Sequence, residues 1–128
     1  MRFDQKAREN LEAAERLLPD DESGESDAFL NAAASRAYYA VYLAIADCAQ
    51  QLRRPFTHDR HDYYRHDTLP RDAVSWRILD DDSGDDLELL RGRRIKADYQ
   101  EDPVDREEAS ESLDLARSML GRLLGESR

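Results

Sequence analysis

The residues best suited to chemistry lie in the segment 89–99. Arg91, Arg94 and Asp98 are spaced three and four residues apart, so on a helix their side chains form one stripe. An ion pair between Arg94 and Asp98 would fix the orientation of the guanidinium and leave donors free for an anion. The same spacing also fits a solvated charged face with a structural ion pair, and spacing alone leaves both interpretations open.

A second set of polar side chains lies in a long apolar segment around residue 36. Arg36 is the sole charged residue between Ala28 and Ala46, and the same segment contains Tyr38, Tyr39 and Tyr42. An arginine in an apolar helix usually has a carboxylate or carbonyl partner, and we expect Asp98 to be that partner. The tyrosines are expected to pack in the core or in an interface.

Histidines occur only at positions 58, 61 and 66, interleaved with aspartates. Neutral imidazoles beside carboxylates can bind zinc or nickel, but nothing here matches a compact motif such as H-E-x-x-H. We therefore predict no metal site and no other cofactor, and we place His58, His61 and His66 on a loop or groove rim. The alternative is that one of them reaches Arg94 across the bundle or a dimer and supplies acid–base function.

The charge balance limits the classes of partner. The chain has 128 residues, with 29 acidic against 19 basic side chains and a net charge of −10. A general DNA-binding protein would present a basic face, and here bases exceed acids only in the segments 49–79 and 89–99. One cysteine, no apolar signal segment and no apolar run near the twenty residues of a membrane span predict a cytoplasmic protein without a membrane interaction.

Apolar spacing predicts helices throughout the chain and no strands. The first helix is expected over 4–18, and the second runs from a cap at Ser26 or Asp27 to before Pro55. Two short helices separated by Pro70 follow, the second of them over 71–79. The last two helices are expected over 87–99 and from 102 to 125. The fold class is therefore all-α, a single domain over 1–128 built as an antiparallel up-and-down four- to five-helix bundle. The second helix is apolar almost all round and should be central.

Helix starts are predicted from capping residues. The acidic run 80–86 is interpreted as a loop that supplies Asp85 or Asp86 as the cap of the fourth helix. The last helix is expected to begin with Asp102 as cap and Pro103 at its first position.

Two runs in this sequence resemble the HEPN domain family. They are NAAASRAYYAVYLAI at 31–45, which contains Arg36-Ala37-Tyr38-Tyr39-Ala40, and RRIKADY at 93–99, which contains Arg94-Ile95-Lys96-Ala97-Asp98-Tyr99. The resemblance covers nearly the whole chain. It implies a helical bundle that dimerises and often works beside a small nucleotidyltransferase in a toxin–antitoxin pair. Many members are metal-independent ribonucleases, whose site is an arginine followed after four to six residues by histidine.

The sequence departs from that motif where the histidine should stand. Tyr99 follows Arg94 after four intervening residues, and no histidine occurs after His66. A tyrosine with a pKa near 10 is a poor general base at neutral pH. We therefore predict a module, catalytically weak or inactive, that binds a nucleotide or RNA phosphate and pairs with a nucleotidyltransferase.

The predicted site combines the charged side chains of both runs. Arg91, Arg94, Lys96 and Arg36 are the candidate ligand-binding residues, and Asp98 and Tyr99 should shape the site. The alternatives are an active ribonuclease toxin, with Arg94, Asp98 and Tyr99 as its catalytic residues, and a non-catalytic protein-interaction scaffold.

A homodimer is the last expectation from the sequence. The second helix is apolar on more faces than a small bundle can bury, and its three tyrosines point at different angles. Surplus aromatic surface of this kind marks an interface, and a two-fold dimer is the symmetric arrangement.

Overall fold

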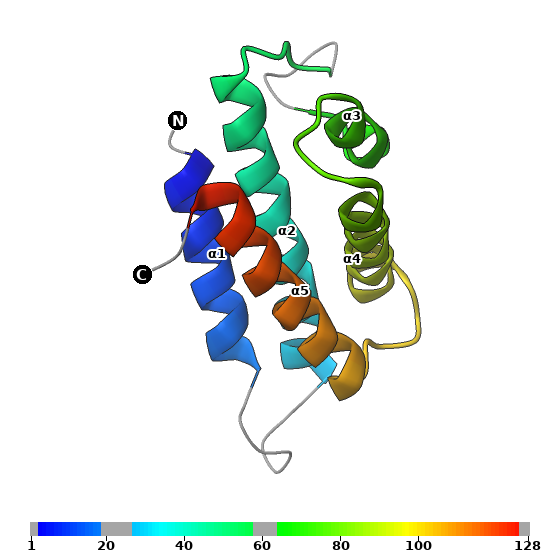
Figure 1. Cartoon of the computed structure of the whole chain (residues 1–128). Helices are drawn as coiled ribbons and strands as arrows, with labels where there is room; N and C mark the ends of the chain where they lie inside the picture. The colour runs from blue at the N-terminus through cyan, green and yellow to red at the C-terminus, as the bar shows by residue number, and fades with distance from the viewer. Residues whose placement is uncertain (1–2, 19–26, 58–63, 126–128) are drawn as a thin grey trace.

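The computed structural model describes residues 3–18, 27–57 and 64–125, and these contain five α-helices and no strand. The helices are α1 (Phe3–Leu17), α2 (Asp27–Gln51), α3 (Leu69–Ser75), α4 (Asp81–Tyr99) and α5 (Arg106–Leu124). The long helices alternate in direction, α1 and α4 running one way and α2 and α5 the other, with α3 beside the upper end of α4 (Figure 1). The predicted all-α antiparallel bundle is confirmed. Within the described ranges, every helix is too short or too polar to cross a bilayer.

Helix α2 is the centre of the bundle, as its composition predicted. It packs against α1, α4 and α5, and its small side chains allow these neighbours to approach closely. Its buried alanines are Ala33, Ala34, Ala37, Ala40, Ala44, Ala46 and Ala49. Larger side chains fill the remaining core, among them Ile45 of α2, Leu87 and Leu90 of α4, and Leu120 of α5.

Helix α4 begins earlier than the sequence suggested. Asp80 is its cap, and the Asp80 Oδ1 atom accepts a hydrogen bond from the backbone N–H of Ser83 at 2.8 Å. The prediction of a loop over 80–86 capped by Asp85 or Asp86 is therefore wrong. The acidic side chains stand in the first turns of the helix, where its positive end favours them, while Gly84 lies against α3 and the buried Ser83 accepts a hydrogen bond from Arg122 of α5.

Helix α5 begins later than the Asp102-Pro103 pair suggested. Its cap is Asp105, which forms a reciprocal capping box with Glu108. The chain before it cannot enter the helix because Val104 is fully buried and its N–H donates to Asn31 Oδ1 of α2 at 2.9 Å. The predicted cap at Asp102 is wrong, whereas the end of α5 at Gly125, with φ 71°, is as expected.

The described part of the segment before α4 contains one short helix, where two were predicted for the whole segment. Helix α3 starts at Leu69, with Pro70 in its first turn, and ends at Ser75. The predicted helix over 71–79 is therefore shifted and shortened. Residues 64–68 are not helical, and the rest of the piece predicted before Pro70 lies outside the described residues.

Tyr38 and Tyr42 of α2 are buried within the single chain. Tyr38 and Tyr42 are only 1% and 6% exposed, and both rings contact His66. The interpretation of these tyrosines as surplus interface surface is therefore wrong. The exposed large hydrophobic side chains of the described residues are spread over both ends of α2 and over α4: Phe29, Leu52, Leu89 and Tyr99.

Candidate functional site

The predicted stripe on α4 faces the tyrosines of α2. The Arg94 Nη2 atom donates to the Tyr39 hydroxyl at 2.7 Å, and its Nε lies 3.3 Å from Asp98 Oδ2. Asp98 also accepts a hydrogen bond from the Ser35 hydroxyl at 3.3 Å. The predicted Arg94–Asp98 pair is present, and it joins α4 to α2. Only 16% of the Arg94 side chain is exposed, so its guanidinium is held in one place.

Aromatic rings surround the Arg94 guanidinium. Its central carbon lies 5.3 Å from the ring centre of Tyr39, 5.4 Å from that of Tyr99 and 6.0 Å from that of Tyr38. These distances are within the range of cation–π attraction. Tyr99 is 72% exposed, so one side of the guanidinium is bordered by a ring that solvent or a ligand can reach.

His66, in the turn that precedes α3, lies in the same group of side chains. We call this group the Arg94 cluster; its members are Tyr38, Tyr39, Tyr42, His66, Arg91, Arg94 and Asp98. Its Nδ1 lies 2.6 Å from the Tyr38 hydroxyl, and its ring stacks on Tyr42 with centres 4.3 Å apart. The Tyr42 hydroxyl donates to the backbone carbonyl of Tyr64 at 2.7 Å and accepts from its N–H at 3.2 Å. Tyr42 therefore fixes the chain two residues before the imidazole.

The surroundings keep His66 neutral. Burial, together with the positive charges of Arg94 and Arg91, lowers its pKa to about 4. Burial also raises the pKa of the Tyr38 hydroxyl, which stays protonated. The hydrogen bond thus joins two neutral groups: where Tyr38 donates, the proton of the imidazole is on Nε2, and where Tyr38 accepts, the proton is on Nδ1 and Nε2 is the basic nitrogen.

Arg91 supplies the second positive charge of the cluster. It stands one turn before Arg94, its side chain is 27% exposed, and its Nη1 lies 3.5 Å from Glu88. The Nε atoms of Arg91 and Arg94 are buried without a hydrogen-bond partner. Both guanidiniums act on His66 through their positive charge.

Two residues predicted for the site lie elsewhere. Arg36 donates to Asn10 of α1 at 3.1 Å, so the prediction that Asp98 is its partner is wrong. Ser35, not Arg36, occupies the α2 position that faces Asp98, and one residue along a helix turns the side chain by about 100°. Lys96 points to α5, where its Nζ donates to Glu108 at 2.9 Å.

The opposite face of α4 is structural. Arg93 forms an ion pair with Glu111 at 2.6 Å and donates to the backbone carbonyl of Glu108. The hydrogen bond from Lys96 lowers the pKa of the Glu108 carboxyl and raises that of the lysine. These contacts join α4 to α5. Of the two adjacent arginines, Arg93 therefore holds α4 against α5, whereas Arg94 faces the tyrosines of α2.

The sequence interpretation assigned Tyr39 to packing and did not consider Ser35. The spacing of Tyr39 from Tyr42 and of Ser35 from Tyr39 places them on one face of α2, which is the signal that could have identified them. His58 and His61 lie outside the described residues. In the part of the chain that is described, no three potential metal ligands gather.

Comparisons with known proteins give one result. The family model described as the HEPN domain matches residues 2–126. No curated protein and no solved structure matches the chain.

Proposed function

The chain belongs to the HEPN domain family, and we propose that it binds the phosphate group of a nucleotide or an RNA at Arg91 and Arg94. The observation that carries this proposal is the Arg94 guanidinium, held by Tyr39 and Asp98 while its Nη1 makes no hydrogen bond to the described residues. A fixed, planar guanidinium with free donors is the group that binds phosphate oxygens with defined geometry.

Neighbouring groups suit the rest of such a ligand. The exposed ring of Tyr99 lies beside Arg94 and offers a surface on which a base can stack. Neutral His66 adds a hydrogen-bond donor or acceptor without repelling the arginines. Asp98 accepts bonds from α2 and α4 and orients Arg94, so it is a positioning residue.

Cleavage of RNA is the second candidate, favoured by the position of His66. Its Nε2 could take the proton of a ribose 2′-hydroxyl, whose oxygen then attacks phosphorus while the 5′-oxygen leaves and takes up a proton. Arg94 would stabilise the added negative charge. A pKa of about 4 makes the unliganded imidazole a weak base, and a bound phosphate would raise that pKa because it opposes the charges of Arg91 and Arg94.

The assembly around this site is also a proposal. HEPN domains often dimerise, and we propose that this chain forms a homodimer and pairs with a small nucleotidyltransferase in a toxin–antitoxin system. The support is family membership, since no described contact within the chain indicates either partner. Sedimentation equilibrium and co-purification with the product of a neighbouring nucleotidyltransferase gene test the two assemblies separately.

A titration of short single-stranded RNA and of ATP tests the binding proposal. Arg94→Ala should lose at least about tenfold in affinity, since one charge-assisted contact contributes more than 1.4 kcal/mol. Arg94→Lys should recover little of it, because the planar two-pronged geometry is lost. Arg91→Ala should show a smaller loss, and binding should weaken steeply with salt in a chain of net charge −10.

Arg93→Ala is the matched control, because it removes the same charge from the same helix on the face toward α5. Equal binding by wild type and the Arg94 variants would make Arg94 a structural residue. Incubation of RNA with wild type and with His66→Gln distinguishes the two candidates: cleavage by wild type alone supports a ribonuclease, and binding without cleavage supports a binding module.

A further inference from the structure

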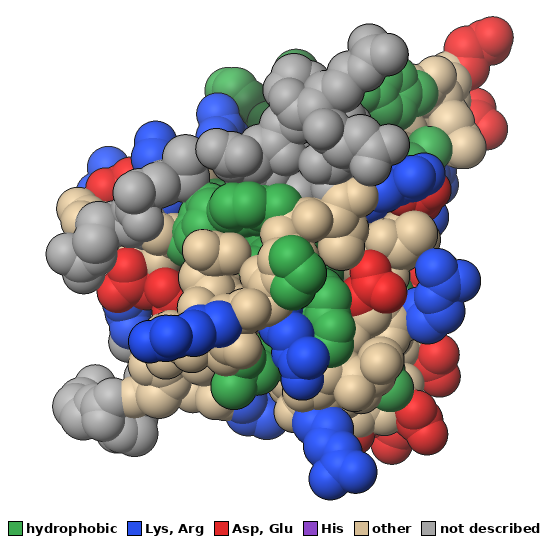
Figure 2. Space-filling model, turned by 90° about the horizontal axis from the view of Figure 1, so that it is seen from above, with side chains coloured by type: hydrophobic (Ala, Val, Ile, Leu, Met, Phe, Trp, Pro, Cys, Tyr) green, Lys and Arg blue, Asp and Glu red, His purple; other side chains and the backbone are tan. Residues whose placement is uncertain are grey.

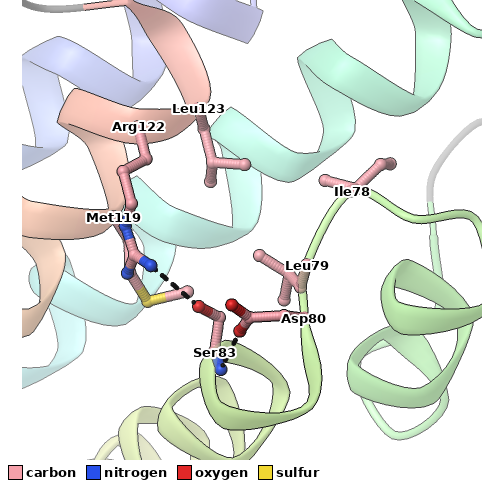
Figure 3. A pocket seen from close by; sticks show the side chains of 7 residues that line it. All are labelled: Ile78, Leu79, Asp80, Ser83, Met119, Arg122 and Leu123. Atoms are coloured by element: carbon pink, nitrogen blue, oxygen red, sulfur yellow. Dashed lines mark hydrogen bonds between the residues drawn. The ribbon is translucent and has the colours of Figure 1, made fainter.

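A groove crosses the end of the bundle where α2, α3 and α5 terminate, far along α4 from the Arg94 cluster. Its deeper part is a hollow of about 190 Å³ between the turn 76–79 and α5, with Leu79 and Met119 among its lining residues (Figure 3). A shallower hollow of about 300 Å³ continues toward the end of α2. We call this surface the end groove and define it by Leu52, Arg77, Ile78, Met119, Arg122 and Leu123.

The end groove is lined by both apolar and polar side chains, since Ser83 and Asp80 line the deeper hollow beside Leu79 and Met119, and several arginines stand around it (Figure 3). Exposed hydrophobic side chains lie among lysines and arginines on this end of the molecule, with carboxylates mostly farther out (Figure 2). Arg53, Arg54, Arg77 and Arg122 stand here, and none forms an ion pair with a described carboxylate. Asp80 also lines the deeper hollow, where its side chain is used as the α4 cap.

Two of these arginines occupy backbone positions that normally favour glycine. Arg53 follows α2 with φ 57°, and Arg77 follows α3 with φ 63°. In both places the next N–H bonds back to a carbonyl five residues earlier, Arg54 to Ala49 and Ile78 to Ala73. Such left-handed caps strain residues with a Cβ.

Helix α5 ends at the same side of the bundle with Gly125 in the left-handed conformation, at φ 71°. The chain therefore uses glycine at one of three neighbouring caps and arginine at the other two. A cation near a helix C-terminus does complement the helix dipole, but that interaction does not require the strained position. Stability therefore gives no full account of Arg53 and Arg77, and a strained residue on an exposed surface points to a role in binding.

We propose that the end groove binds an acidic peptide segment of a partner protein, with one apolar side chain in the deeper hollow and carboxylates against Arg77, Arg122 and Arg53. Each hollow is at or below the size of a small-molecule site, and the deeper one suits a single side chain. The Arg122 Nη1 atom already donates to Ser83 at 3.1 Å, which fixes this guanidinium beside the deeper hollow (Figure 3).

The lining favours a peptide over RNA. Among the described residues, no aromatic ring lines either hollow, whereas single-stranded nucleic acid is bound on aromatic rings. The nearby ring of Trp76 is already covered by Arg54 at 6.0 Å and packs edge-on against Tyr64.

The test uses a fluorescein-labelled peptide of aspartates with one central leucine, measured by fluorescence polarisation on the full chain. The matched peptide has serine in place of leucine and should bind about tenfold more weakly. Arg77→Gly and Leu52→Ser should each weaken binding of the leucine peptide about tenfold, and the melting temperature of Arg77→Gly should not fall. Arg71→Ala removes an exposed arginine of α3 that lines a different hollow, so it should leave binding unchanged.

Several results would overturn the proposal. Equal binding of the leucine and serine peptides would show that the deeper hollow is not used. A lower melting temperature of Arg77→Gly with unchanged binding would leave these arginines as helix caps only. Tighter binding of an RNA of the same length, lost in Arg77→Gly, would make the surface a nucleic-acid site. A dimer that Arg77→Gly dissociates, without peptide binding by wild type, would identify a second copy as the occupant.

Discussion

The neutral state of His66 predicts how stability depends on pH. The imidazole has a pKa of about 4 in the folded chain, against an ordinary value of 6.5. The unfolded chain therefore binds more protons than the folded chain between pH 6.5 and pH 4, so the free energy of unfolding falls as the pH is lowered through this window. The contribution is fully present above pH 6.5.

The size of the effect follows from the shift. At pH 5 the unfolded imidazole is almost fully protonated and the folded one is almost fully neutral, which corresponds to about 2 kcal/mol. His66 is only half-buried, and screening by solvent reduces the expected loss to roughly 1 kcal/mol.

Urea unfolding of wild type and His66→Gln at pH 7 and pH 5 measures this loss. Glutamine can still bond the Tyr38 hydroxyl but does not titrate, and the other titrating groups are the same in both proteins. Wild type should lose roughly 1 kcal/mol more than the variant on acidification. The same pH dependence in both proteins, or a steeper one in the variant, would refute the reasoning.

Two further pairs of variants test the helix positions by urea unfolding. Gly92→Ala should raise the free energy of unfolding by up to about 1 kcal/mol, since its Cβ meets nothing within 4 Å. The free energy of unfolding of Gly84→Ala should be lower than that of Gly92→Ala by more than about 1 kcal/mol, since the added Cβ would lie 2.7 Å from Val74 Cγ2. Equal free energies for the two variants would show that α3 does not pack against Gly84. Asp105→Ala should cost about 1 kcal/mol through loss of the α5 capping box. Asp102→Ala should stay within about 0.5 kcal/mol, and the reverse order would restore Asp102 as the cap.

The sequence predicted the part of the site that lies on one helix. Spacing alone placed Arg91, Arg94 and Asp98 on one stripe, and the ion pair between the last two is present. The partner of Arg36 could not be predicted in this way, because it depends on how α2 is rotated about its axis. Asn10 of α1 faces Arg36, and that contact is set by packing between helices.

The position of His66 depends on long-range contacts. Its segment has no apolar periodicity, so the pattern along the chain indicated only a loop or groove rim. The imidazole reaches the cluster because the hydroxyl of Tyr42, distant in sequence, holds the backbone of Tyr64. The possibility that a histidine reaches Arg94 from elsewhere could be stated from the sequence, but the residue could not be chosen.

The predicted helix starts were wrong where several neighbouring aspartates could each serve as the N-cap. Asp80, Asp85 and Asp86 are all acceptable caps by residue type, and packing favours Asp80, because a helix that begins there places Gly84 against Val74 of α3. In the same way, α5 begins after the buried Val104 and not at the predicted Asp102. Periodicity predicted that these helices exist, whereas tertiary contacts set where they begin.

The most direct test of the phosphate site is the pKa of His66, measured by NMR of the imidazole with and without saturating ATP. The unliganded chain should show a pKa of about 4 for this residue. A phosphate bound among Arg91, Arg94 and His66 should raise that value by at least about one unit, because it opposes the charges that depress it. ATP that binds without moving the His66 resonances or their pKa would place the ligand elsewhere and contradict the account.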